Sequence, residues 1–145
     1  MAANEVSMSE SGLSDTGLSA TNLSDTNLCV LVGELSSDPR PLELESGSLL
    51  LRCEVTVRAG GVTDSVPVVR FDPMASERSL SVGDRVAVVG RVHRRFFRAG
   101  GTTVSRTEVV ADRVVPVRNG VRASKLFESA RTRLGTALPV GVAST

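Results

Sequence analysis

One segment of the sequence, RVHRRFFRAGG at positions 91–101, combines side chains suited to binding a polyanion. It holds four arginines and two of the four phenylalanines of a chain without tryptophan or tyrosine. Arginine presents a planar fork of donors that fits phosphate oxygens, and it stacks on aromatic faces. Two adjacent phenylalanines on a strand point to opposite faces. We therefore expect at least one of Phe96 and Phe97 to lie outside the core.

The charge of the chain is distributed unevenly. The net charge is +1, yet residues 1–28 carry four acidic residues and no basic one. Residues 91–133 carry 11 basic against 3 acidic residues, which gives this part of the chain a net charge of +8. A basic region of this kind indicates a polyanionic partner.

No pattern typical of an enzyme, a metal site or a cofactor site occurs in the sequence. His93 is the only histidine, no GxSxG nucleophile motif, P-loop or GxGxxG is present, and the acidic residues are scattered. Cys29 and Cys53 lack CxxC spacing and lie in apolar runs, so we expect buried, reduced thiols in a cytosolic protein. There is no apolar run long enough for a membrane span, and the N-terminus does not resemble a secretory signal.

Residues 28–118 are expected to form one all-β domain. Period-two alternation of apolar and charged residues predicts strands separated by turn-forming clusters such as SSDPRP, AGG and RAGG. Gly90 is expected at a bend, and Asp72 is expected to cap a short helix that begins with Pro73. The expected elements are strands at 28–35, 46–58, 62–71, 81–97 and 102–117, with the helix at 72–80. Five strands with a helix between the third and fourth is the order of the OB-fold barrel, the oligonucleotide/oligosaccharide-binding fold.

The two ends of the chain are expected to differ from this barrel. Residues 1–27 are rich in Ser and Thr and place leucines at every fifth position, which resembles a short pentapeptide repeat; we expect this tail to be disordered. Residues 119–145 begin with an amphipathic helix that is expected to end at Gly135. Phe127 on its apolar face is expected to anchor the helix, either on a binding partner or on the barrel.

Several of these segments resemble bacterial single-stranded DNA-binding proteins. NLCVLVGELSSDP at 27–39 is similar to the opening strand of that family, and LSVGDRVAVVGRV at 80–92 is its second specific match. SGSLLLRCEVTVR, VVRFDPMASE and TEVVADRV keep the family's order. The resemblance covers roughly residues 27–118, which is the whole barrel and neither tail.

The resemblance implies that single strands bind by stacking of bases on aromatic rings in a basic groove. It assigns stacking roles to Phe71 and Phe97 and a basic role to Arg95. Phe97 could instead pack against another subunit, and the alternation around Phe71 is equally compatible with a core position. Phe96, on the opposite parity from Phe97, is expected in the core. Ser65 stands where the family has a tryptophan, and the loop that holds a second tryptophan in many members is shortened to AGG. Six arginines are expected to contact phosphates: Arg58, Arg70, Arg94, Arg95, Arg98 and Arg106. The alternative is that the arginines of the hairpin are exposed to solvent and bind nothing.

The function expected from the resemblance is non-enzymatic binding of single-stranded DNA, or of RNA, in replication, repair or recombination. No cofactor, metal, small-molecule substrate or membrane is expected. The protein is expected in the cytoplasm, associated with the nucleoid, as a dimer or tetramer. The alternative is an OB-fold protein-interaction module that has lost most of its affinity for nucleic acid.

Overall fold

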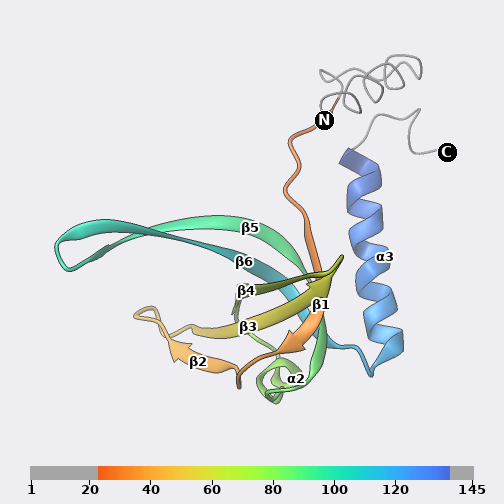
Figure 1. Cartoon of the computed structure of the whole chain (residues 1–145), viewed down its shortest axis with the longest axis horizontal. Coiled ribbons are helices and arrows are strands. Elements are labelled where there is room, and N and C mark those ends of the chain that lie inside the picture. The colour runs from red at the N-terminus through yellow and green to blue at the C-terminus, as the bar shows by residue number, and fades with distance from the viewer. Residues whose placement is uncertain (1–22, 138–145) are drawn as a thin grey trace. The chain divides into compact units, whose positions relative to one another are not determined.

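The computed structural model describes residues 23–137, and its larger compact unit runs from Asn27 to Ala130 (Figure 1). This unit contains the strands of the described chain, the short helix between them and most of the C-terminal helix. The tail that is expected to be disordered, residues 1–27, lies almost wholly outside the described residues. The unit therefore includes the whole of the predicted barrel.

Five strands close into a barrel. They are β1 (Cys29–Leu35), β3 (Leu49–Ala59), β4 (Val62–Phe71), β5 (Arg85–Ala99) and β6 (Thr102–Pro116). The order around the barrel is β1, β5, β6, β4 and β3, and β3 returns to β1 through the pairs Glu34–Thr56 and Leu35–Val55. This closed order, with a helix between β4 and β5, confirms the predicted all-β, five-stranded OB-fold barrel.

The alternating sequence pattern is realised as an aliphatic interior. On β3, Leu51, Cys53 and Val55 are buried in the barrel core, whereas Arg52 between them is exposed. None of the buried residues in this core cluster is aromatic, so the phenylalanines occupy other positions. The cluster consists of Leu35, Leu51, Cys53, Val55, Val68, Leu80, Val86, Val88, Val109, Ala111 and Val114.

Both cysteines are free thiols, as predicted, but their burial differs. Cys53 is buried, and Cys29 is only half-buried. Burial, with a smaller contribution from the Glu77 carboxylate, raises the pKa of the Cys53 thiol to about 11. Burial also raises the pKa of Cys29. Because the thiolate is the reactive form, both side chains are poor nucleophiles near neutral pH.

A sixth strand, β2 (Arg40–Glu43), lies in the region for which the sequence predicted a turn. It pairs antiparallel with the first half of β3, from Arg40–Arg52 to Glu43–Leu49, and all of its residues are exposed. Proline cannot donate to a ladder, and Pro41 is tolerated because β2 is an edge strand. The short exposed strand has no periodic apolar signal, which explains why pattern analysis missed it.

The short helix α2 spans Ala75–Arg78, which lies inside the predicted range of 72–80 but is shorter at both ends. The prediction that Asp72 caps the helix is wrong, because Asp72 has a φ of +52° and Met74 occupies the N-cap position. N-cap residues have extended backbone angles, as Met74 does, and Asp72 instead turns the chain after β4. The Glu77 carboxylate accepts a hydrogen bond from the Met74 N–H at 2.7 Å, which replaces the predicted cap.

Glu77 is fully buried and ties α2 to two strands. Its carboxylate accepts from Arg70 Nε at 2.9 Å and from the Val114 N–H at 2.9 Å, and it lies 3.4 Å from Arg113 Nε. Burial alone would raise the pKa of Glu77, but the hydrogen bonds from Met74 and Val114 and the Arg70 guanidinium hold it below its ordinary value. The carboxylate is therefore ionised and fully hydrogen-bonded inside the protein.

The C-terminal helix α3 spans Gly120–Ala137. Asn119 Oδ1 accepts a hydrogen bond from the Arg122 N–H at 3.3 Å and so caps its first turn. Within the compact unit, Ala123, Leu126 and Ala130 of α3 form a second core cluster with Ala87, Val89 and Val115 of the barrel wall. The prediction that the helix ends at Gly135 is wrong, because it continues for two more residues.

Phe127 packs against this second cluster and is half-buried. Phe127 is expected to anchor the helix either on a binding partner or on the barrel, and in the structure it packs on the barrel. A partner role for the ring is not needed to explain its position.

Gly90 lies at an irregularity in the pairing of β5 with β6, where the register shifts between Val89 and Gly90. A Cβ at Gly90 would collide with the backbone carbonyl oxygen of Val110, and the neighbouring Ala111 Cα is also too close. The side-chain-free residue therefore allows β6 to cross β5 closely at the predicted bend.

Replacing Glu77 by glutamine should destabilise the fold at neutral pH by roughly 3 kcal/mol, because Arg70 and Arg113 lose their buried counter-ion. The pKa of Glu77 is lowered in the folded state, so its contribution is present above the ordinary value of about 4.3 and is lost as pH falls through the lowered pKa. When the free energy of unfolding is measured with denaturant at several pH values, it should fall less steeply at acid pH in Glu77→Gln than in the unmodified protein. The exposed Glu45→Gln is the control, and equal losses in the two variants would contradict this role.

Replacing Gly90 by alanine should destabilise the protein by roughly 1–3 kcal/mol, since the colliding atoms belong to the backbone of β6 and cannot rotate away. Gly135→Ala is the matched control: nothing lies within 4 Å of its added Cβ, and it lies in a helix. It should stabilise by about 0.5–1 kcal/mol. Thermal unfolding of both variants measures the difference, and a neutral Gly90→Ala would show that β6 has room to shift.

Candidate nucleic-acid interface

The outer half of the β5–β6 hairpin, residues 91–107, extends beyond the other strands and is called the arm (Figure 1). Pairing of β1 with β5 ends at Cys29–Gly90. Just beyond that pair, the Asn27 amide donates to the Val92 carbonyl at 2.8 Å and accepts from the Val92 N–H at 2.9 Å. Asn27 thus continues the ladder for one more position, after which the arm is a two-stranded ribbon.

The two phenylalanines of the arm point to opposite faces, as predicted, but the assignment of Phe96 to the core is wrong. Phe96 is 62% exposed, while Phe97 is half-buried. Phe96 shares the parity of the buried Val86 and Val88, which motivated the prediction. By Phe96, however, β5 has left the barrel, and Val92 on the same parity is already 46% exposed. Strand parity gives the face of a residue, but not whether that face is covered.

Glu108 organises one face of the arm. It is only 5% exposed, and its two carboxylate oxygens lie 3.4 Å from Arg95 Nε and 3.7 Å from Arg106 Nε. Arg95 and Arg106 are directly paired across the two strands, so without the carboxylate their like charges would repel. Glu108 therefore holds both guanidiniums in place at the root of the arm and leaves a net positive charge.

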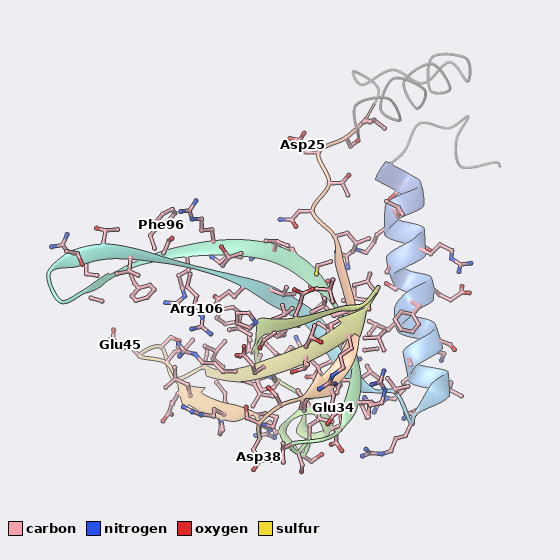
Figure 2. All side chains as sticks on the ribbon, viewed as in Figure 1. Asp25, Glu34, Asp38, Glu45, Phe96 and Arg106 are labelled. Carbon is pink, nitrogen blue, oxygen red and sulfur yellow. The ribbon has the colours of Figure 1, made fainter. Side chains whose placement is uncertain are left out.

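Each arm phenylalanine has an arginine over its ring. The guanidinium carbon of Arg95 lies 4.8 Å from the centroid of Phe97, and that of Arg94 lies 5.2 Å from the centroid of Phe96. Figure 2 shows Phe96 on one side of the arm and Arg106 on the side toward β2 and β3. Cation–π contacts of this kind combine a flat ring and a positive charge on both faces.

An open groove of about 250 Å³ lies on the outer face of the sheet, at the root of the arm. Arg40, Arg52 and Arg106 contribute positive charge, and three carboxylates offset it. The lining residues are Ser37, Asp38, Arg40, Arg52, Cys53, Glu54, Pro67, Val68, Val69, Arg106 and Glu108. Sequence analysis missed Arg40 and Arg52; the placement of Arg52 on the wet face of β3 was the only available signal.

Strand register places both predicted stacking residues on this face. Directly paired residues point to the same side of a sheet. Arg52 pairs with Val69, and Val69 pairs with Val110 of β6, which shares the parity of Glu108 and Arg106. Phe71 follows Val69 by two positions on β4 and is 45% exposed, so the core alternative for Phe71 does not apply. Phe97 shares the parity of Arg95.

The other arginines expected to contact phosphates do not lie in this groove. Arg94 and Arg98 belong to the opposite face of the arm, where Arg94 donates to Ser105 Oγ and Arg98 donates to the Gly101 carbonyl. Arg70 is committed to Glu77 and has a side chain only 16% exposed. Arg58 lies six residues beyond Arg52, about 20 Å along β3, and is 3.9 Å from Glu34.

The family model of the single-strand binding protein family matches residues 26–117. The chain belongs to this family. A search of curated proteins found no matching protein. Members of the family are non-enzymatic proteins that bind single-stranded DNA, and the matched residues coincide with the barrel and include the whole arm.

The family assignment gives meaning to two departures in β3 and β4 from the family's pattern of aromatic residues. Ser65, where the sequence resemblance implies a family tryptophan, donates a hydrogen bond to Glu54 Oε2 at 2.7 Å. The shortened loop is a tight turn, since β3 ends at Ala59, β4 begins at Val62, and Gly60 and Gly61 both have positive φ. The aromatic surface of this member is therefore limited to phenylalanine rings.

Residues 23–137 contain no group of three or more histidine, cysteine or acidic side chains that would hold a metal ion. Neither helix in the same range is long and apolar enough to cross a membrane.

Replacing Phe97 by alanine should weaken binding to an oligonucleotide of any base composition by about 1–3 kcal/mol, because a stacking surface is lost. Phe96→Ala is the matched control, since it removes the same ring from the opposite face of the arm. Fluorescence anisotropy with labelled oligo-dT measures both. If Phe96→Ala weakens binding more than Phe97→Ala, the interface lies on the other face.

Proposed function

We propose that this protein binds single-stranded DNA across the outer face of the barrel, between the arm and β2. The single observation that carries the proposal is the gathering of Phe71, Phe97, Arg52, Arg95 and Arg106 on one face of the sheet. Bases stack on the two rings, and the guanidiniums contact phosphates. This mechanism reads little of the base edges and therefore tolerates many sequences.

The charges of the groove argue for moderate affinity. Its three arginines face Asp38, Glu54 and Glu108, so the lining residues are neutral overall, and Arg95 of the arm adds positive charge on the same face. Stacking is worth about 1–3 kcal/mol per base, and the serine at position 65 removes one platform. We infer a member that binds more weakly, or in a more specialised setting, than a member with a full set of tryptophans.

The wider role follows from the same proposal. Exposed single strands arise in DNA replication, repair and recombination, and we place the protein in these processes, in the cytoplasm with the nucleoid. Homo-oligomerisation is part of the proposal. Val30 and Val32 are 47% and 39% exposed on β1, whose pairing with β3 is limited to Glu34 and Leu35. Pairing of this free edge with a neighbour would satisfy its backbone groups.

A salt titration tests the proposal. The logarithm of the association constant for oligo-dT should fall linearly with the logarithm of salt concentration, with a slope of about −0.7 per neutralised phosphate. Three or four contacts give about −2 to −3. A flat response, or no binding at low salt, would rule out the function. A protein partner recovered by such a non-binding chain would favour the interaction-module alternative.

A further inference from the structure

A second basic cleft lies between β6 and α3, away from the groove. It encloses about 400 Å³ and is lined by Arg113, Val115, Arg122, Lys125, Leu126 and Ser129. All of these residues belong to the compact unit, and the helix that supplies four of them lies outside the residues matched by the family model. The cleft is therefore a feature that family membership does not explain.

The cleft contains an excess of positive charge. Three of its lining residues are cationic and none is acidic. Among the described residues, no acidic side chain lies within ion-pair distance of Arg122 or Lys125. Arg113 touches Glu77 through Nε, but Glu77 is shared with Arg70 at the shorter distance of 2.9 Å. One carboxylate therefore faces two arginines, so Arg113 is only partly neutralised and the cleft keeps an excess of positive charge.

The remaining groups fit a phosphodiester chain. The Arg113 contact with Glu77 uses Nε, so that contact leaves the donors of its two terminal amino groups unused. Ser129 adds a hydroxyl to the lining, and the buried Val115 and Leu126 of the second core cluster close the cleft. Arginine and lysine in combination are suited to phosphate oxygens.

We infer that this cleft is a second phosphate-binding site, which holds the backbone of the same single strand after it leaves the groove. The inference rests on the proposed function. Arg106 in the groove and Arg113 in the cleft belong to one strand, seven residues or about 24 Å apart along β6. Strand β6 thus connects the two sites rigidly, and α3 lengthens the path of the nucleic acid beyond the barrel.

The test compares short and long oligonucleotides on the whole chain. The double variant Arg122→Gln/Lys125→Gln should bind an oligo-dT of about 8 nucleotides, which lies within the 4–16 nucleotides of one OB barrel, as the unmodified protein does. For an oligo-dT of about 30 nucleotides, its salt slope should be shallower by about 1.4, at 0.7 per contact. Its affinity at low salt should fall on the order of tenfold.

The control double variant Arg78→Gln/Arg131→Gln removes the same charge from exposed positions outside the cleft. If the affinity for the long oligonucleotide falls by the same factor in both double variants, the net charge of the protein explains the loss and the inference fails. The inference also fails if binding of polyglutamate, or of inorganic phosphate at millimolar concentration, requires Arg122 and Lys125 while binding of the long oligonucleotide does not. If the unmodified protein binds neither oligonucleotide, the proposed function fails instead, so the two failures are distinguishable.

Discussion

The pairing of β5 with β6 is the interaction on which the candidate sites depend. The two strands are paired from Val86–Pro116 at one end of the barrel to Ala99–Thr102 at the tip of the arm, with one irregularity at Gly90. Inside the barrel they contribute valines to both core clusters, and outside it they carry arginines and phenylalanines. The same ladder that stabilises the fold therefore fixes the position of the arm, because each added pair satisfies its own backbone groups beyond the barrel.

Two buried carboxylates determine where the key arginines lie. Glu77 and Glu108 are the buried charged residues of the described chain, and each lies between two arginines. Glu77 joins α2 to β4 and β6 and places Arg113 at the edge of the basic cleft. Glu108 places Arg95 and Arg106 at the root of the arm. A buried charge is stable only when it is paired and hydrogen-bonded, so these carboxylates limit the freedom of the guanidiniums around them. At each of the two sites one carboxylate pairs with two guanidinium groups, and the remaining positive charge can attract an anion.

Much of the barrel could be predicted because its strands obey a simple rule. In half-buried strands apolar and polar residues alternate, and this alternation around Leu51, Cys53 and Val55 can be recognised in the sequence alone. β2 was missed because an exposed edge strand needs no apolar face, and Arg40 was missed with it. Phe96 was misassigned because parity continues past the point where the barrel ends. Arg70 was expected at the surface because a sequence does not reveal which carboxylate will meet an arginine; Glu77 is seven residues away along the chain and belongs to another element.

The sequence by itself determined the residue types and their order: an alternating aliphatic barrel, a basic aromatic hairpin, an amphipathic helix and the match to a single-strand binding family. Only the tertiary structure decided which arginines act together. Arg52, Arg95 and Arg106 come from three strands and share a face, whereas Arg94 and Arg95 are adjacent in sequence and lie on opposite faces. The reason is physical. Alternation along a strand separates neighbours, while register across a closed sheet brings distant residues together, and register is fixed by the burial of all strands at once.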